Sequence, residues 1–168
     1  RISLDSDAKY NSAVLLTGGK IDPNRYDKHS LTPFGEAIPY AWRVPALQRA
    51  VLALGAGGMK FDLGWGERSG PLNVPIKVPT SASPSASPSA SPSPPPSPTT
   101  TLRVVTPICF EVVRSTLCRQ LVHEGDPNAP VLLVNISNDG WFTEWPEGRA
   151  QHFQIARWRC IELGVPMV

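Results

Sequence analysis

A block of 22 residues at 80–101 divides the chain into two parts with different chemistry. Thr80–Thr101 consists of seven Pro, eight Ser, four Thr and three Ala, and it contains no charged side chain. Its Ser-Ala-Ser-Pro array cannot bury enough apolar surface to offset the entropy of ordering the backbone, which predicts a disordered or polyproline-II tether. We expect an insertion in a surface loop, with a ligand for SH3- or WW-type domains as the alternative.

The rest of the chain has the composition of a globular domain. All 16 Lys and Arg and all 14 Asp and Glu lie outside the block. The net charge of +2, without any long run of Lys or Arg, gives no electrostatic case for nucleic-acid binding. No stretch approaches the roughly 18 apolar residues of a membrane span. The chain begins with Arg and stops where a further strand would begin, so we expect residues 1–168 to be a partial domain, incomplete at both ends.

Short apolar runs bounded by turn residues predict the elements of the first part. Ser12–Thr17 is a continuous apolar run closed by Gly18 and Gly19, which predicts a strand. Ala46–Leu54 places apolar residues at helical spacing after a proline and before a glycine, which predicts a helix. The Gly- and Pro-rich residues that follow predict a loop with at most one edge strand.

Strands and helices alternate in the second part. Leu102–Phe110 and Val131–Ile136 are rich in β-branched residues and predict buried strands, while Glu111–Glu124 and Gly148–Leu163 predict helices. Gly164 stands at the C-cap position of the last helix. This order is typical of a layered α/β domain. We expect the last helix to pack inward through Phe153, Ala156, Cys160 and Leu163.

Three cysteines are too few and too scattered for a disulfide framework, and their spacing does not fit a zinc site. We expect Cys118 and Cys160 to be small buried hydrophobes. Cys109 differs, because it ends an apolar strand and precedes a predicted helix. The positive end of a helix dipole favours a thiolate, which makes Cys109 a candidate nucleophile.

Charged and amide side chains at two other points could complete a site. Lys28 and Glu36 flank a rigid Pro-Phe-Gly turn, and a lysine beside a thiolate lowers the thiol pKa and stabilises an oxyanion. Asn138, Asp139 and Trp141 follow the second strand, at the sheet edge where ligands of α/β proteins collect. The alternatives are solvated loop charges in the first case and an Asx turn in the second.

Four motifs in this order resemble the carbon–nitrogen hydrolase (nitrilase) superfamily, and more narrowly its apolipoprotein N-acyltransferase family. They are Tyr-x-Lys-x-x-Leu-x-Pro-Phe-Gly-Glu at 26–36, Ile-Cys-Phe-Glu at 108–111, Asn-Ile-Ser-Asn-Asp-Gly-Trp-Phe at 135–142, and Gln-His with Ala-Arg-x-Arg and Glu-Leu-Gly-x-Pro-Met at 151–167. The resemblance implies an α-β-β-α sandwich. Soluble amidases of this fold usually continue the cysteine motif as Cys-Tyr-Asp-x-Arg-Phe-Pro, which this chain lacks.

The resemblance also implies roles for individual residues. Cys109 matches the family's nucleophile and Lys28 its catalytic lysine, while Glu36 and Glu111 match glutamates that support the site. The glutamate of the Glu-Lys-Cys triad is expected upstream of residue 1. Phe110 stands where tyrosine is usual, a departure that alters packing rather than chemistry. Ala37 and Gly140 are further departures of this kind. Neither a cofactor nor a metal is implied.

The activity implied by the resemblance is the last step of lipoprotein maturation. A phospholipid would donate an acyl chain through a cysteine thioester to the amine of a diacylated apolipoprotein. The enzyme would lie in the bacterial inner membrane with its catalytic domain on the periplasmic side. Two alternatives remain open at this point, which are a soluble nitrilase-type amidase and an inactive interaction module tethered by its Pro/Ser segment.

Overall fold

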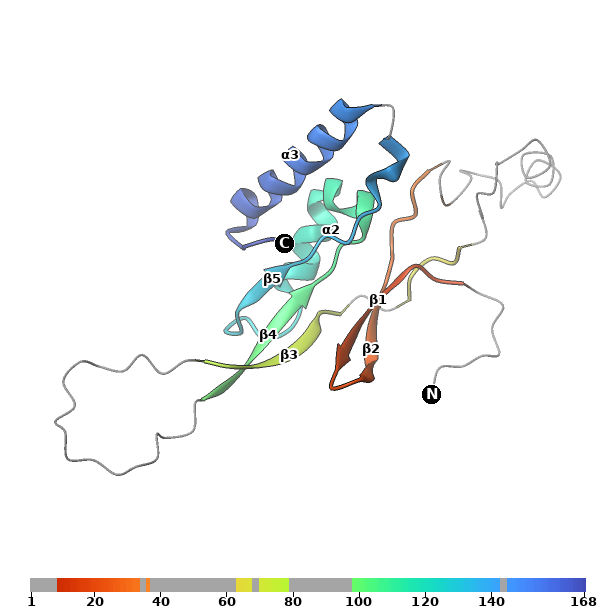
Figure 1. The fold of residues 1–168 in the computed structure, drawn as a ribbon. Helices are drawn as coiled ribbons and strands as arrows, with labels where there is room; N and C mark the ends of the chain where they lie inside the picture. The colour runs from red at the N-terminus through yellow and green to blue at the C-terminus, as the bar shows by residue number, and fades with distance from the viewer. Residues whose placement is uncertain (1–8, 34–35, 37–62, 68–69, 79–97, 143–144) are drawn as a thin grey trace, which may run out of the picture.

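The computed structural model describes residues 9–33, 36, 63–67, 70–78, 98–142 and 145–168 (Figure 1). Along the chain these residues form two antiparallel strands, a third strand, then a strand, helix, strand, helix series. The predicted helix at Ala46–Leu54 lies outside the described residues, as do residues 80–97 of the Pro/Ser block.

The first sheet is an antiparallel hairpin of β1 (Ser12–Thr17) and β2 (Lys20–Asp27). Its turn residues Gly18 and Gly19 have φ angles of 57° and 75°, which only glycine adopts without strain, and such a turn matches the twist of a hairpin. The strand predicted at Ser12–Thr17 and its Gly-Gly closure are therefore confirmed.

The second sheet has the order β3-β4-β5, formed by Leu72–Lys77, Thr99–Val105 and Val131–Leu133. The first pair is antiparallel and the second is parallel. Strand β3 is the edge strand expected before the insertion. The threonines at the end of the Pro/Ser block belong to β4 rather than to a tether, because Thr99–Thr101 pair with residues 75–77 of β3. The insertion thus joins two strands of one hairpin.

Strands β4 and β5 are shorter than the sequence predicts. Strand β4 ends at Val105 instead of Phe110, because Pro107 has no N–H to donate to a ladder. The pairing resumes for one residue, where Ile108 bridges Ile136 in parallel. Met167 also forms a parallel bridge, with Leu133, so the expected strand-like pairing after the last helix is present.

The helix predicted at Glu111–Glu124 is two separate elements. A 3-10 helix, η2, spans Cys109–Val113, and α2 spans Ser115–His123, with the extended residue Arg114 between them. The break has a tertiary cause, because the side chain of Glu111 is bonded to the segment after β2. Cys109 thus stands at the start of the five-residue η2 rather than before one long helix.

The last helix, α3, spans Pro146–Leu163 and follows a short 3-10 helix, η3, at Asp139–Phe142. Gly164 caps α3 in the left-handed conformation, as predicted. The expected inward face is wrong at Phe153, which is 62% exposed, whereas the neighbouring His152 is buried together with Ala156. Polar contacts of His152, which helical periodicity does not register, turn this side chain inward.

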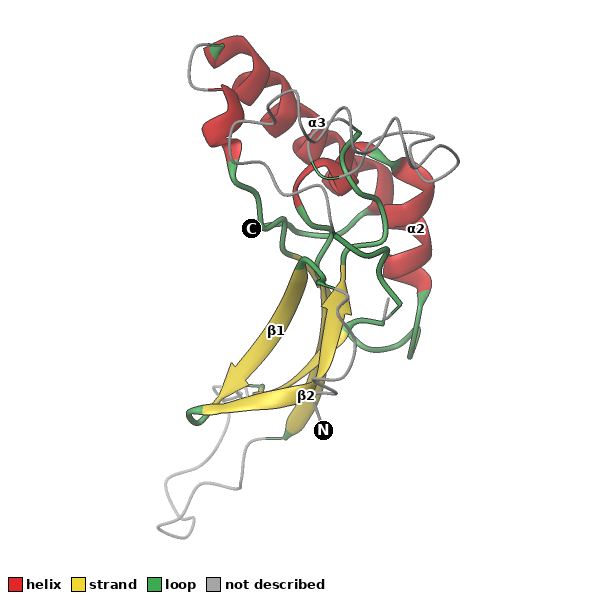
Figure 2. Ribbon diagram, turned by 90° about the vertical axis from the view of Figure 1, so that its right-hand side faces the viewer, coloured by secondary structure: helices red, strands yellow, loops and turns green. Residues whose placement is uncertain are grey.

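One core joins the two sheets and the helices. Ala13 and Tyr26 of the first sheet pack with Val105 and Leu133 of the second sheet and with Leu121 of α2. Figure 2 shows the helices at one end of the molecule and the β1–β2 hairpin at the other, with connecting loops between them. The predicted α/β class is confirmed, and the two sheets with their helices agree with a nitrilase-like fold. Within the described ranges, none of the helices is long and apolar enough to span a bilayer.

Candidate active site

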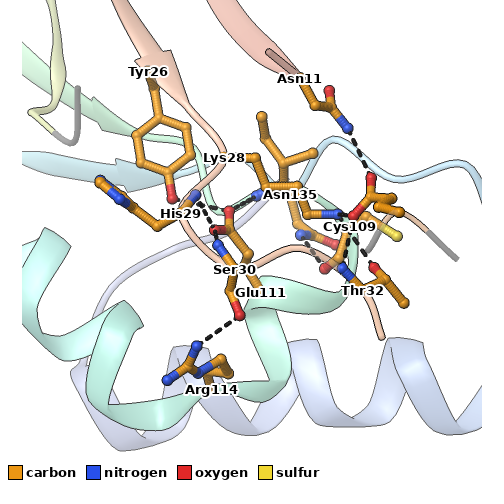
Figure 3. Close-up of polar contacts among 12 residues, drawn as sticks. Asn11, Tyr26, Lys28, His29, Ser30, Thr32, Cys109, Glu111, Arg114 and Asn135 are labelled. Atoms are coloured by element: carbon orange, nitrogen blue, oxygen red, sulfur yellow. Dashed lines mark hydrogen bonds and ion pairs between the residues drawn. The ribbon is translucent and has the colours of Figure 1, made fainter. Parts of the chain in front are cut away.

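Glu111 is the centre of the polar cluster between β2 and η2 (Figure 3). Its carboxylate is fully buried and accepts four hydrogen bonds, two on each oxygen. The backbone N–H groups of His29 and Ser30 donate at 2.8 and 2.7 Å, that of Ile108 donates at 2.8 Å, and the Tyr26 hydroxyl donates at 2.9 Å. Four donors suit an ionised carboxylate, which only accepts. Glu111 thereby ties the end of β2 to η2.

Lys28 follows directly after β2 and is almost fully buried. Its ammonium group lies 2.5 Å from Glu36 Oε2 and donates a longer bond of 3.4 Å to Thr32 Oγ1. Burial raises the pKa of Glu36, but hydrogen bonds from Lys28, the Thr32 backbone and Asn11 outweigh it, so the pKa is lowered overall. The structure therefore brings the two charges flanking the Pro-Phe-Gly turn together as an ion pair.

The backbone around Lys28 is fixed by two other segments. Its N–H donates to the carbonyl of Asn11 at 2.8 Å, and its carbonyl accepts from the N–H of Gly66 at 2.9 Å. A methyl group on Gly66 would overlap the carbonyl of Asp27 and lie 2.7 Å from the carbonyl of Lys28. Only glycine allows this close approach of two backbones.

Cys109 occupies a sharp turn between a strand and a helix. Its φ angle is 53°, a left-handed value that costs a residue with a side chain about 1–3 kcal/mol. Its N–H donates to Ile136 at 2.9 Å, and Asn135 Nδ2 donates both to its carbonyl at 3.2 Å and to Pro107 at 2.7 Å. A strained turn of this kind presents a nucleophile beyond the edge of a sheet.

Cys118 and Cys160 lie in other surroundings. Cys118 is completely buried in α2, and burial raises the pKa of its thiol to about 11. Cys160 is half-buried, and its thiol contacts the carbonyl of Ala156 at 3.6 Å, one turn back in α3. The prediction that Cys118 is a buried hydrophobe is confirmed. A thiol with a raised pKa is a poor nucleophile at neutral pH.

The three candidate residues that follow β5, which are Asn138, Asp139 and Trp141, have different surroundings. Asn138 Oδ1 accepts from the N–H of Gly140 at 3.1 Å, which is the Asx turn of the alternative interpretation. Asp139 Oδ1 accepts from Ser137 Oγ at 2.6 Å and contacts His152. The side chain of Trp141 lies outside the described residues.

The structure brings most of the predicted residues into one cluster. Figure 3 shows Lys28, Cys109 and Glu111 around the junction of β2 and η2, where Glu111 bonds the segment that follows Lys28. Sequence reasoning missed Tyr26 and Asn135 as individual site residues, although both lie inside its motifs. Their position in the sequence could have indicated them, because each stands near the end of a strand that leads into the site.

The chemistry available here is that of a thiol nucleophile with a nearby buried cation. Among the residues that the structure describes, no three His, Cys, Asp or Glu side chains come together as possible metal ligands. A thiol can attack an acyl carbon, and an ammonium group can stabilise the oxyanion that results.

Comparison with known proteins identifies relatives over nearly the whole chain. No protein-family model matches the chain. The chain is 30% identical to an apolipoprotein N-acyltransferase of Geobacter metallireducens over 162 residues, 94% of this chain and 23% of that protein. It is 30% identical to apolipoprotein N-acyltransferase 2 of Treponema denticola over 98% of this chain and 26% of the relative. The apolipoprotein N-acyltransferase of Verminephrobacter eiseniae is 31% identical over 98% of this chain and 25% of the relative. The chain thus spans about a quarter of the length of these curated relatives.

Proposed function

Because this chain belongs to the apolipoprotein N-acyltransferase family, we propose that it supplies the nucleophile and the lysine of an acyltransferase in lipoprotein maturation. The observation that carries the proposal is the cluster of Figure 3, in which Glu111 bonds the segment after buried Lys28 to the segment of Cys109, which stands on a strained turn. The names of the relatives favour this activity over a soluble amidase. An inactive module would have no need of a strained cysteine or of a buried lysine held by an ion pair.

The first half of the proposed reaction forms a thioester. A carboxylate base takes the thiol proton of Cys109, and the sulfur attacks the ester carbonyl of a phospholipid. The carbon–oxygen bond of the ester breaks, and the lysophospholipid leaves with a proton. In this proposal the base is the glutamate of the Glu-Lys-Cys triad, which the resemblance leads us to expect upstream of residue 1.

Lys28 would stabilise the oxyanion of this step. Its ammonium group carries three protons, of which two are directed at Glu36 and Thr32 in the structure. In the proposed mechanism the third donates to the oxyanion as negative charge develops. Glu36 and Thr32 orient the ammonium group, so it is in place before the substrate binds.

The second half of the proposed reaction forms an amide. The free amine of a diacylated apolipoprotein attacks the thioester carbonyl and the carbon–sulfur bond breaks. The proton that the amine loses goes to the sulfur, which regenerates the Cys109 thiol. The donor is proposed to be a membrane phospholipid, and the site of action is proposed to be the periplasmic face of the bacterial inner membrane. Glu111 positions the two catalytic segments by bonding both of them.

Trapping the acyl-enzyme tests the proposal. The full-length protein is incubated with phospholipid vesicles, quenched in acid and digested, and the acylated peptide is identified by mass spectrometry. We expect a thioester on Cys109 that disappears when a diacylated lipopeptide is added. Cys109→Ala should abolish both the thioester and the transfer, whereas the matched controls Cys118→Ala and Cys160→Ala should retain them. A thioester on Cys118, or transfer by the Cys109→Ala protein, would overturn the proposal.

A further inference from the structure

His152 is a buried histidine of α3 whose two ring nitrogens both contact acceptor atoms. Nδ1 lies 3.1 Å from Asp139 Oδ1, and Nε2 lies 3.3 Å from the backbone carbonyl of Cys109. The side chain is 9% exposed and also packs against Phe142, with ring centroids 6.5 Å apart. The reaction proposed above gives this histidine no role.

The two contacts make the ring a bridge between η3 and the backbone of Cys109. Nδ1 meets the carboxylate of Asp139, and Nε2 meets the carbonyl of Cys109. A carbonyl oxygen only accepts hydrogen bonds, so Nε2 bonds it when this nitrogen carries the ring proton. The Ser137 hydroxyl fixes the same carboxylate oxygen of Asp139 at 2.6 Å.

The carbonyl that His152 reaches belongs to the most constrained residue of the site. Cys109 is the only non-glycine residue with a positive φ angle in the described part of the chain. Asn135 donates to the same carbonyl, and Ile136 accepts from the Cys109 N–H. The peptide groups on both sides of the Cys109 α-carbon are therefore bonded to other segments. Asn135 and Ile136 follow β5, and His152 belongs to α3.

We propose that His152, held by Asp139, is a positioning residue that clamps the Cys109 carbonyl through Nε2 and keeps the nucleophile in its left-handed conformation. The proposal rests on the proposed function, in that Cys109 is taken as the nucleophile. The titratable groups in contact with the ring are Asp139 of η3 and Cys109 of η2, and the next acid of η2, Glu111, is bonded to Tyr26 and to the segment after β2. A histidine that merely fills the core would need neither proton-sharing contact.

The first test observes the ring directly. The full-length protein is labelled with ¹⁵N-histidine, and the His152 signals are assigned by their loss in His152→Gln. We expect Nε2 of His152, the nitrogen that faces the Cys109 carbonyl, to carry a proton. In Asp139→Asn the side-chain amide can donate to Nδ1, so Nε2 should keep its proton. An Nε2 without a proton in the unmodified protein would overturn the proposal.

The second test measures the reactivity of the nucleophile, and it needs no acyl transfer. Alkylation of Cys109 by iodoacetamide is followed at pH 7 in a Cys118→Ala, Cys160→Ala background. We expect His152→Ala to slow alkylation at least about tenfold, because the sulfur leaves its aligned position. His152→Gln can still donate to the Cys109 carbonyl and should recover most of the rate. Alkylation of His152→Ala at the unmodified rate, or no recovery in His152→Gln, would contradict the clamp.

The control for this test is His123→Ala, an exposed residue at the end of α2, which should alkylate at the unmodified rate. If His152→Ala does not fold, two other variants still decide the outcome. The ring signals of His152 are followed in Asp139→Asn, and the alkylation rate of Cys109 is followed in His152→Gln. Failure of the proposed function would appear separately, as the absence of an acyl thioester on Cys109 while the clamp results stand.

Discussion

Lys28 and Glu111 are both withdrawn from solvent, and the structure satisfies their charges in opposite ways. Lys28 has a counter-ion, Glu36, whereas Glu111 has four neutral donors from the backbone and from Tyr26. A buried charge without such partners would be strongly destabilising. At the scale of single residues, removing a partner of either charge should therefore lower the free energy of unfolding.

Glu36→Gln should destabilise the protein at neutral pH and lower acyl transfer. The change leaves buried Lys28 without its counter-ion, at a cost of about 3 kcal/mol. The pKa of Glu36 is lowered in the folded state, so its contribution is present above its unfolded pKa of about 4.3 and is lost as the pH falls further. Urea unfolding at pH 7 and pH 3.5 should show the two proteins converging in acid. An equal difference at both pH values would contradict this account.

Glu111→Gln should cost more stability than the removal of any one of its partners. The amide NH₂ group must face two donors wherever it points, so at least one buried N–H loses its acceptor, at about 1–3 kcal/mol for each bond lost. Tyr26→Phe is the matched control, because it removes a single donor and should cost about 1 kcal/mol. Thermal unfolding measures both. Equal midpoints for the two variants would show that the backbone donors do not depend on the carboxylate.

At the scale of elements, the site forms where strand ends and short helices are fastened to one another by side chains. Strand β4 stops before Pro107, η2 begins at Cys109, and a separate helix begins at Ser115. The Arg114 side chain between the two helices donates to Ser30 Oγ at 2.6 Å, which fastens this break to the segment after Lys28. The start of η2 thus positions Cys109, and the bond from Arg114 holds the segment that follows Lys28.

Gly66→Ala should displace the end of β2. The new methyl group would overlap the carbonyl of Asp27, which belongs to the backbone and cannot rotate away, so the chain must shift at a cost of about 1–3 kcal/mol. The N–H of Gly66 also bonds the carbonyl of Lys28. The shift should therefore displace Lys28 and lower acyl transfer even in the fraction of the protein that remains folded. Gly70→Ala is the control, since its methyl group would lie 3.8 Å from the Glu124 side chain. Parallel measurements of unfolding and transfer compare the two, and a Gly66→Ala protein as active as Gly70→Ala would contradict the argument.

At the scale of the whole molecule, two sheets share one core, and the Pro/Ser insertion lies between paired strands. Val78 donates to the carbonyl of Pro98 at 2.9 Å, and β3 and β4 pair from there in register. The strand ends are therefore held together beside the insertion by their own ladder. We expect this hairpin to form whatever the length of the loop that closes it.

Replacing residues 80–97 by a four-residue Gly-Asn-rich turn should leave fold and activity largely unchanged. Shortening the loop alters its closure entropy by only about 1 kcal/mol, in the stabilising direction. The unfolding midpoint and acyl transfer of the shortened protein provide the measurement. A deletion that extends through Thr99–Thr101 is the contrasting variant, because it removes half of the β3–β4 ladder and should destabilise. Loss of folded protein in the shorter deletion would show that the segment is structural.

The sequence by itself determined the features that rest on local chemistry. The Gly-Gly turn of the hairpin, the Gly164 cap and the alternation of strands and helices follow from neighbouring residues, whose conformational preferences act over a few positions. The motifs around Lys28, Cys109 and Glu111 likewise indicated the candidate site, through their resemblance to the motifs of a known family.

Only the tertiary structure decided the features that depend on distant partners. Glu111 meets donors more than 80 residues away, and this contact accompanies the break of the predicted helix at Arg114. His152 is buried instead of Phe153 because its polar ring contacts Asp139 and the Cys109 carbonyl, whereas helical periodicity takes account of apolar side chains alone. Gly66 is required by the backbone of Asp27, on a strand far from it in sequence. Buried hydrogen bonds and close backbone approaches join residues that no local pattern relates, so they enter only when the chain has folded.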